Sequence, residues 1–189
     1  MNSPKIALLI SGTGSNARRL ISYKPLSSYC SFIVISSKKN ESIMHFCNDI
    51  NVEYIEHIGS TDEVNIQIEK TCVEKFVSHI ILAGFLKKIS PEIIKRFKGK
   101  ILNIHPSLLP KFGGKGMYGR HVHQAVFNAR EKNTGTTIHE VSEIYDQGKI
   151  LAQYEVSISE SDDVDKIEQK VRLLEEQYFP SVVKNFIIG

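Results

Sequence analysis

The first hundred residues alternate short apolar runs with longer amphipathic stretches. A run that is apolar almost throughout, such as KIALLI at 5–10, is typical of a strand covered on both faces. This pattern predicts strands at 5–10, 32–35, 53–56, 79–82 and 101–104. Apolar residues at helical spacing predict helices at 17–23, 41–50 and 62–76. The alternation of strands and helices predicts a parallel sheet with right-handed crossovers.

The pattern changes after residue 105. A long loop rich in Gly and Pro, PSLLPKFGGKGMYG, covers 106–119, and a loop of this length in a compact domain is usually functional. A short helix at 120–129 follows. Strands at 136–141 and 150–158 alternate as half-exposed strands do and are expected to pair antiparallel. A final helix is predicted at 163–179, with Ser161, Asp162 and Asp163 at its start. We therefore predict an α/β fold: a Rossmann-like, mostly parallel central sheet with helices on both faces and an antiparallel C-terminal strand pair.

Length, composition and charge limit the number of domains, the location and the classes of partner that we expect. A chain of 189 residues and 21.4 kDa suggests one domain over 1–189, with halves at about 1–100 and 101–189. The net charge is only +3 and no long Lys/Arg run concentrates it, which argues against a nucleic-acid partner. The N-terminal apolar run is too short for a membrane span or signal segment, so we expect a cytoplasmic protein. Cys30, Cys47 and Cys72 form no zinc motif, and we expect reduced, buried thiols.

A glycine loop follows the first predicted strand. Its residues are Gly12, Thr13, Gly14, Ser15 and Asn16. Glycines permit a tight turn, and the N-terminus of the next helix offers free N–H groups to an anion, so phosphate binding is favoured. The spacing also fits the dinucleotide fingerprint G-x-G-x-x-A, but SSKK at 36–39 supplies no acidic residue for a ribose. NAD is disfavoured, NADP is not strictly excluded, and a tight turn without ligand is the alternative.

Three polar residues are candidates for acyl-transfer chemistry. Asn103 and His105 lie two positions apart at the end of a predicted strand, so their side chains leave on the same face. An amide donor beside an imidazole suits a developing oxyanion. Asp146 lies in the loop between the last two strands, where a carboxylate can orient or charge an imidazole. Taken singly, a structural histidine is as good an interpretation for His105, and an ordinary turn is favoured for Asp146.

Together, these segments resemble one family. SGTGSN, ILAGFLKKISP, ILNIHPSLLPKF, HVHQA, GTTIHEV and YDQGKILAQ occur in the order and spacing of glycinamide ribonucleotide formyltransferases, from Ile6 to about Pro180. The resemblance implies a formyltransferase fold. It also implies formyl transfer from 10-formyltetrahydrofolate, a consumed co-substrate, to the amine of glycinamide ribonucleotide in purine (IMP) biosynthesis. No metal is implied, and a monomer or homodimer is expected.

The resemblance also assigns roles by position. Asn103, His105 and Asp146 match the catalytic trio. Protonated His105 and Asn103 would stabilise the oxyanion, and Asp146 would raise the pKa of His105. Residues 12–16 match the substrate-phosphate loop, and Glu175 matches the carboxylate that holds the amine and ribose end of the substrate. The folate-binding positions are Leu86, Lys87, Lys88, Ile89, Asn103, Ser142, Glu143, Ile144, Tyr145 and Asp146. Thr137, His139 and His121 are expected in or beside the same cleft, and His121 with His123 is not a metal pair.

The sequence departs from the family's pattern in two segments, and other functions stay as alternatives. Segment 62–65 lacks an Arg that often meets the folate tail in this family, so Lys87 or Lys88 is the candidate substitute. The GGKGMYG segment is expected to form a flap over the substrate. Other 10-formyltetrahydrofolate-dependent enzymes share the N-I-H-P block, but the methionyl-tRNA enzyme carries a basic C-terminal domain and the hydrolase an N-terminal regulatory domain. An inactive nucleotide-binding module is the alternative outside enzymes, and the intact trio argues against it.

Overall fold

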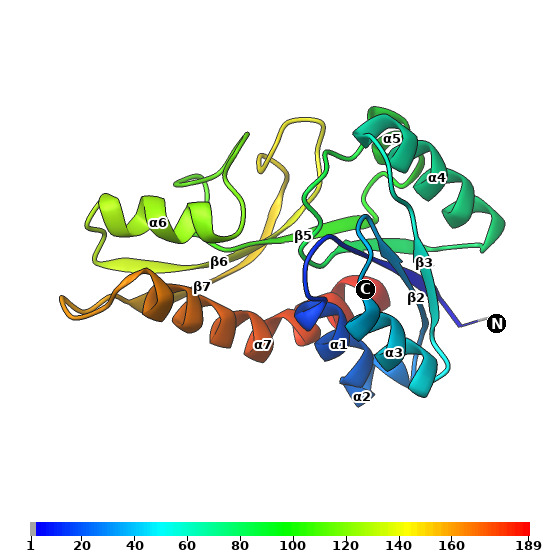
Figure 1. Cartoon of the computed structure of the whole chain (residues 1–189), viewed down its shortest axis with the longest axis horizontal. Coiled ribbons are helices and arrows are strands. Elements are labelled where there is room, and N and C mark those ends of the chain that lie inside the picture. The colour runs from blue at the N-terminus through cyan, green and yellow to red at the C-terminus, as the bar shows by residue number, and fades with distance from the viewer. Residues whose placement is uncertain (1–2) are drawn as a thin grey trace.

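A seven-stranded sheet runs through the chain in this computed structural model, which describes residues 3–189 (Figure 1). The strand order is β3-β2-β1-β4-β5-β6-β7. The first five strands are parallel, and β6 and β7 complete the sheet antiparallel. The strands are β1 (Lys5–Ile10), β2 (Ser31–Ser36), β3 (Glu53–Glu56), β4 (His79–Leu82), β5 (Ile101–His105), β6 (Asn133–Glu140) and β7 (Ile150–Ser157). The predicted fold class is therefore confirmed.

Helices cover both faces of the sheet, because the side chains of β1 alternate between two cores. Ile6, Leu8 and Ile10 face one core, whereas Ala7 and Leu9 face the other. Figure 1 shows the first face covered by α1 (Ser15–Ser22), α2 (Lys24–Ser27), α3 (Glu41–Asp49) and the long α7 (Val164–Ile188). The second face is covered by α4 (Thr61–Glu74) and α5 (Pro91–Arg96). The remaining helix, α6 (Arg120–Asn128), follows the Gly/Pro loop and forms an ion pair with α7 through Arg120 and Asp165.

Local capping explains where several helices begin. Ser60 and Glu63 form a reciprocal capping box at α4, and the Asp163 carboxylate accepts a hydrogen bond from the amide of Lys166 at α7. The end of α7 differs from the prediction, because the helix continues across Pro180 to Ile188. Val183 and Ile187 on this extension are buried, and this packing offsets the hydrogen bond that a proline removes. Within residues 3–189, no helix is long and apolar enough to cross a membrane.

The pairing of β5 with β6 places the second half of the chain beside the first. The antiparallel register sets Asn103 opposite His139 and His105 opposite Thr137. The sequence predicted that the last two strands pair with each other, which is confirmed, but not that β6 also pairs with β5. Residues far apart in the sequence therefore meet at one edge of the parallel strands.

Candidate active site

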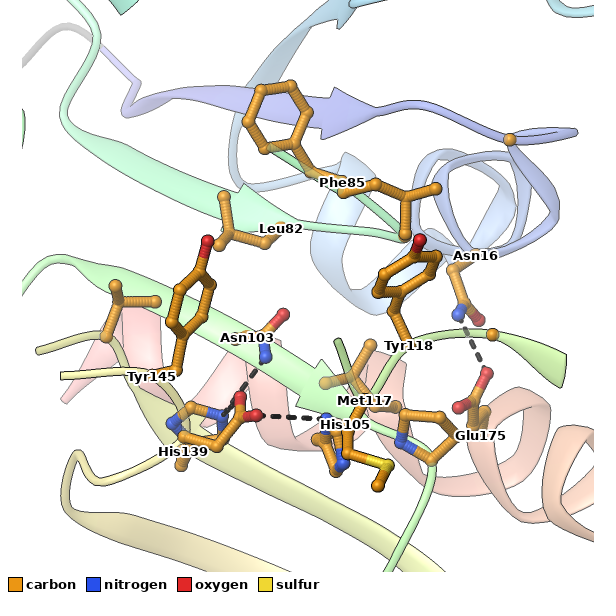
Figure 2. A pocket seen from close by; sticks show the side chains of 18 of the residues that line it. Asn16, Leu82, Phe85, Asn103, His105, Met117, Tyr118, His139, Tyr145 and Glu175 are labelled. Atoms are coloured by element: carbon orange, nitrogen blue, oxygen red, sulfur yellow. Dashed lines mark hydrogen bonds and ion pairs between the residues drawn. The ribbon is translucent and has the colours of Figure 1, made fainter. Parts of the chain in front are cut away.

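A cavity of about 660 Å³ lies at the carboxyl ends of β1, β4 and β5. Ligands bind at this edge in open α/β sheets. Its walls come from the glycine loop, the segment after β4, the end of β5, the Gly114–Gly119 loop, the β6–β7 loop and one side of α7. Figure 2 shows side chains from these elements converging on one space, with Leu82 and Phe85 on one side and His105 and Glu175 on the other.

The cavity floor carries a cluster of two imidazoles, one amide and one carboxylate. The Asp146 carboxylate lies 3.7 Å from Nδ1 of His105 and 3.6 Å from Nε2 of His139. It also accepts a hydrogen bond of 2.8 Å from the backbone amide of Gly114. The amide nitrogen of Asn103 lies 3.1 Å from Nε2 of His139 (Figure 2). The three residues expected to act together are thus gathered in one place.

Hydrogen bonds to backbone carbonyls fix the protons on both imidazoles. Nδ1 of His139 lies 2.8 Å from the Glu140 carbonyl oxygen, which can only accept, so this nitrogen carries a proton. The side-chain nitrogen of Asn103 can only donate, so Nε2 of His139 accepts from it. This orients the amide and leaves its second N–H free. In the same way Nε2 of His105 donates to the Phe112 carbonyl at 2.9 Å, so Nδ1 faces Asp146.

Burial and nearby charges shift the pKa values of this cluster in opposite directions. Burial lowers the pKa of His105 below its ordinary value, although the charge of Asp146 and the hydrogen bond to Phe112 raise it. Asp146 therefore acts in the expected direction but is outweighed. Burial raises the pKa of Asp146, but contacts with the two imidazoles and the Gly114 amide prevail, so this pKa is below its ordinary value. At neutral pH the cluster holds an ionised carboxylate beside a His105 that is mostly neutral.

The glycine loop begins α1 at one end of the cavity. Gly14 is the N-cap residue with φ of 76°, and no side chain caps the helix, so its first N–H groups are free for a ligand. Gly12, Thr13, Ser15 and Asn16 line the cavity, whereas Gly14 does not. A Cβ on Gly14 would lie 2.6 Å from Cδ1 of Ile43, so this glycine is required by packing and backbone conformation.

Glu175 faces the glycine loop from α7. Its carboxylate accepts a hydrogen bond of 2.9 Å from the side-chain amide of Asn16 (Figure 2). Burial raises the pKa of Glu175 to about 7, and the bond from Asn16 opposes this shift. Arg172, one turn earlier on α7, lines the same cavity. This end of the cavity thus offers helix amides, an Arg and a titratable carboxylate.

The segment expected to contact folate forms the opposite wall. Leu86, Lys87, Lys88 and Ile89 all line the cavity. The Leu86 amide donates to the Ser11 hydroxyl at 2.9 Å, which ties this segment to the end of β1. Ser142 and Tyr145 line the cavity from the β6–β7 loop, and Lys88 Nζ lies 5.4 Å from the centre of the Tyr145 ring.

Several predicted positions lie elsewhere. Thr137 does not line the cavity, because the chain at 107–109 covers it: its hydroxyl donates to the Ser107 carbonyl and accepts from the Leu109 amide. Glu143 and Ile144 are exposed and turn away from the cavity. His121 is also outside it, with its ring edge-on to Tyr118. His139, in contrast, lines the cavity and is 2% exposed.

No site role was predicted from the sequence for two residues that line or brace the cavity. His123, 4% exposed, lines the cavity where His121 was expected. Asn65 lies in the segment that lacks the expected Arg, and it braces the wall formed by residues 86–89 instead. Its amide donates to the Lys88 carbonyl, and its oxygen accepts from the Ser90 amide. The apolar face of α6 would have indicated His123, since Val122 and Val126 are buried beside it. Within residues 3–189, no group of three or more metal-ligating side chains is arranged to hold an ion.

The cavity and its amide–imidazole–carboxylate cluster give this α/β fold a site suited to acyl transfer. The chain belongs to the formyl transferase family, whose model, described as "Formyl transferase", matches residues 4–183.

Individual relatives are more specific. The chain is 34% identical to the phosphoribosylglycinamide formyltransferase of Haemophilus influenzae over 98% of this chain and 88% of that protein. It is 35% identical to the trifunctional purine biosynthetic protein adenosine-3 of Gallus gallus over 97% of this chain. It spans only 18% of that protein's length, and 60% of a chloroplastic relative from Vigna unguiculata. The crystal structure of phosphoribosylglycinamide formyltransferase from Bacillus halodurans is similar in fold, with a TM-score of 0.86, 28% identity, and coverage of 97% of this chain and 95% of that one.

Proposed function

We propose that this chain transfers the formyl group of 10-formyltetrahydrofolate to the amine of N1-(5-phospho-D-ribosyl)glycinamide, abbreviated GAR. The products are N-formyl-GAR and tetrahydrofolate, a step of de novo purine synthesis. One observation carries the proposal: a single cavity joins a helix N-terminus with free N–H groups, an amide–imidazole–carboxylate cluster and an apolar wall. The activity named for the Haemophilus influenzae and Bacillus halodurans relatives supports the same assignment.

Each end of the cavity suits one substrate. The free N–H groups at α1 would hold the phosphate of GAR, and Glu175 would hold its amine and ribose end. Opposite, Leu82, Phe85 and Ile89 offer apolar surface beside the backbone of 86–89, which suits the flat ring of a pterin. The amine and the formyl carbon would then meet above Asn103 and His105.

The reaction needs a proton to move from the amine to the folate nitrogen. The amine nitrogen attacks the formyl carbon, and the carbonyl oxygen becomes an oxyanion. The free N–H of Asn103 would stabilise that oxygen, together with the Nε2–H of His105 shared with the Phe112 carbonyl. The amine loses a proton to the His105–Asp146 pair, and N10 of the folate gains one as its bond to the carbon breaks.

A formyl-transfer assay with purified protein tests the proposal. We expect tetrahydrofolate and N-formyl-GAR to form in equal amounts, and only when GAR is present. Release of formate without GAR would identify a hydrolase instead, and nucleotide binding without turnover would identify a binding module. The single-domain organisation, the cytoplasmic location and the monomeric or homodimeric state stay predictions, which limited proteolysis, fractionation and size-exclusion chromatography test.

A further inference from the structure

His123 enters the cavity from the buried side of α6. It is 4% exposed and lines the cavity beside the loop that begins this helix. Gly119, with φ of 51°, is the N-cap residue of α6 and also lines the cavity, whereas Arg120 and His121 are exposed. Gln124, the next residue, is exposed. The helix therefore presents one imidazole to the cavity and its next polar side chain to solvent.

The two ring nitrogens of His123 have different surroundings. Nδ1 is enclosed by protein and has no hydrogen-bond partner among residues 3–189. Nε2 is not among the enclosed unpartnered atoms, and it too forms no hydrogen bond with that part of the chain. Because the residue lines the cavity, the ring meets the cavity through Nε2.

The proton of His123 lies on Nε2. Burial lowers the pKa of His123, Glu168 opposes this shift, and Arg120 and His105 reinforce it, so the ring is neutral at pH 7. A neutral imidazole has one N–H and one lone pair. An enclosed N–H without acceptor is rarer in proteins than an unpaired acceptor. Nδ1 therefore holds the lone pair, and Nε2 presents a donor to the cavity.

We propose that His123 determines specificity for the nucleotide substrate, by donating from Nε2 to an oxygen of the ribosyl-glycinamide part of GAR. The inference rests on the proposed function. His123 shares its part of the cavity with His105 and with Glu168 on α7, the helix that also carries Glu175. Leu82 and Phe85, on the wall proposed for folate, lie across the cavity from His105 and Glu175 (Figure 2).

Two substitutions separate the donor from the bulk of the ring. His123→Leu removes the donor at similar size, whereas His123→Gln keeps an N–H near the position of Nε2. We expect His123→Leu to raise the KM for GAR roughly 10- to 100-fold, since a substrate oxygen loses its partner, while the KM for folate stays within about twofold. His123→Gln should stay within about threefold of wild type for both. Gln124→Leu, a polar-to-apolar change on the exposed side of α6, should change neither KM.

Histidine ¹⁵N chemical shifts give a readout that packing alone would not move. We expect His123 to carry its proton on Nε2 in the free enzyme, and that signal to shift when GAR is added but not when a folate analogue is added. A proton on Nδ1, unaltered GAR affinity in His123→Leu, equal losses in both His123 variants, or an equal loss of folate affinity would each overturn the inference. If His123→Leu does not fold, the ¹⁵N signals of the wild type and the KM values of His123→Gln still test the inference. Wild-type protein that transfers no formyl group to GAR would instead refute the proposed function itself.

Discussion

Replacing Asp146 with Asn would remove one charge from the buried cluster while keeping its size and an acceptor for the Gly114 amide. A carboxylate and an imidazolium 3.7 Å apart attract by about 4.5 kcal/mol at an effective dielectric constant of about 20. Burial already lowers the pKa of His105, and Asp146 works against it, so the substitution should lower this pKa further. We expect turnover at pH 7 to fall on the order of 10²- to 10³-fold, with both substrates still bound.

Single-turnover formyl transfer measures this loss without interference from product release. Glu143→Gln is the matched control, since it neutralises an exposed acid in the same loop outside the cavity, and it should react as wild type does. His105→Ala should be at least as damaging as Asp146→Asn, and the double variant little worse than the worse single one, because residues that act as a unit are not additive. An NMR titration of His105 completes the test. Near-wild-type turnover in Asp146→Asn, or independent losses that multiply, would refute the pairing.

Three further predictions concern the ends of the cavity. Gly14→Ala should destabilise the fold by about 1 kcal/mol or more, because of its positive φ and the contact with Ile43. Gly12→Ala, whose Cβ meets no atom within 4 Å, should keep the wild-type stability and weaken the binding of GAR but not of folate. Urea unfolding measures the stability of both variants, and calorimetry measures the affinity for each ligand. An equal loss of affinity for both ligands would contradict this prediction. Because burial raises the pKa of Glu175 from 4.5 to about 7, the native state loses stability as the pH rises from about 4.5 to about 7. Glu175→Gln should therefore gain up to about 3 kcal/mol at pH 8 and little at pH 4, and equal unfolding free energies at pH 8 would refute this. Lys87→Ala or Lys88→Ala should weaken binding of a polyglutamylated folate more than of the monoglutamate at low salt, and if neither matters the tail is held elsewhere.

The sequence pattern predicted strands better than helix ends and long-range pairing. The apolar runs located β1, β3 and β4 with the bounds that the structure has. The pairing of β5 with β6 has no local signal, because a connection of more than twenty residues separates them. The short helix α2 was missed, and α7 passes through Pro180 because buried side chains beyond it outweigh a local rule.

In the site, too, some positions could be predicted from the sequence and others could not. Asn103, His105 and the glycine loop follow strands directly, so their meeting at one edge could be predicted from topology. Thr137 alternates with His139 along β6, so it was expected to face the same cleft. The segment at 107–109 covers Thr137 instead, and the strand pattern carries no signal for that contact. His123 lies in the HVHQA segment, but its place in the cavity depends on how α6 packs, which the sequence does not show.

The segment between β5 and β6 contacts the reacting centre through main-chain groups. Phe112 contributes its carbonyl to His105, and Gly114 contributes its amide to Asp146. Main-chain groups survive most substitutions, so these two contacts do not depend on which side chains stand at positions 112 and 114. The ladder between β5 and β6, rather than the covalent connection, holds Asn103 beside His139. Lineages or designers can therefore exchange the loop tip to admit a different amine acceptor without rebuilding the chemical step.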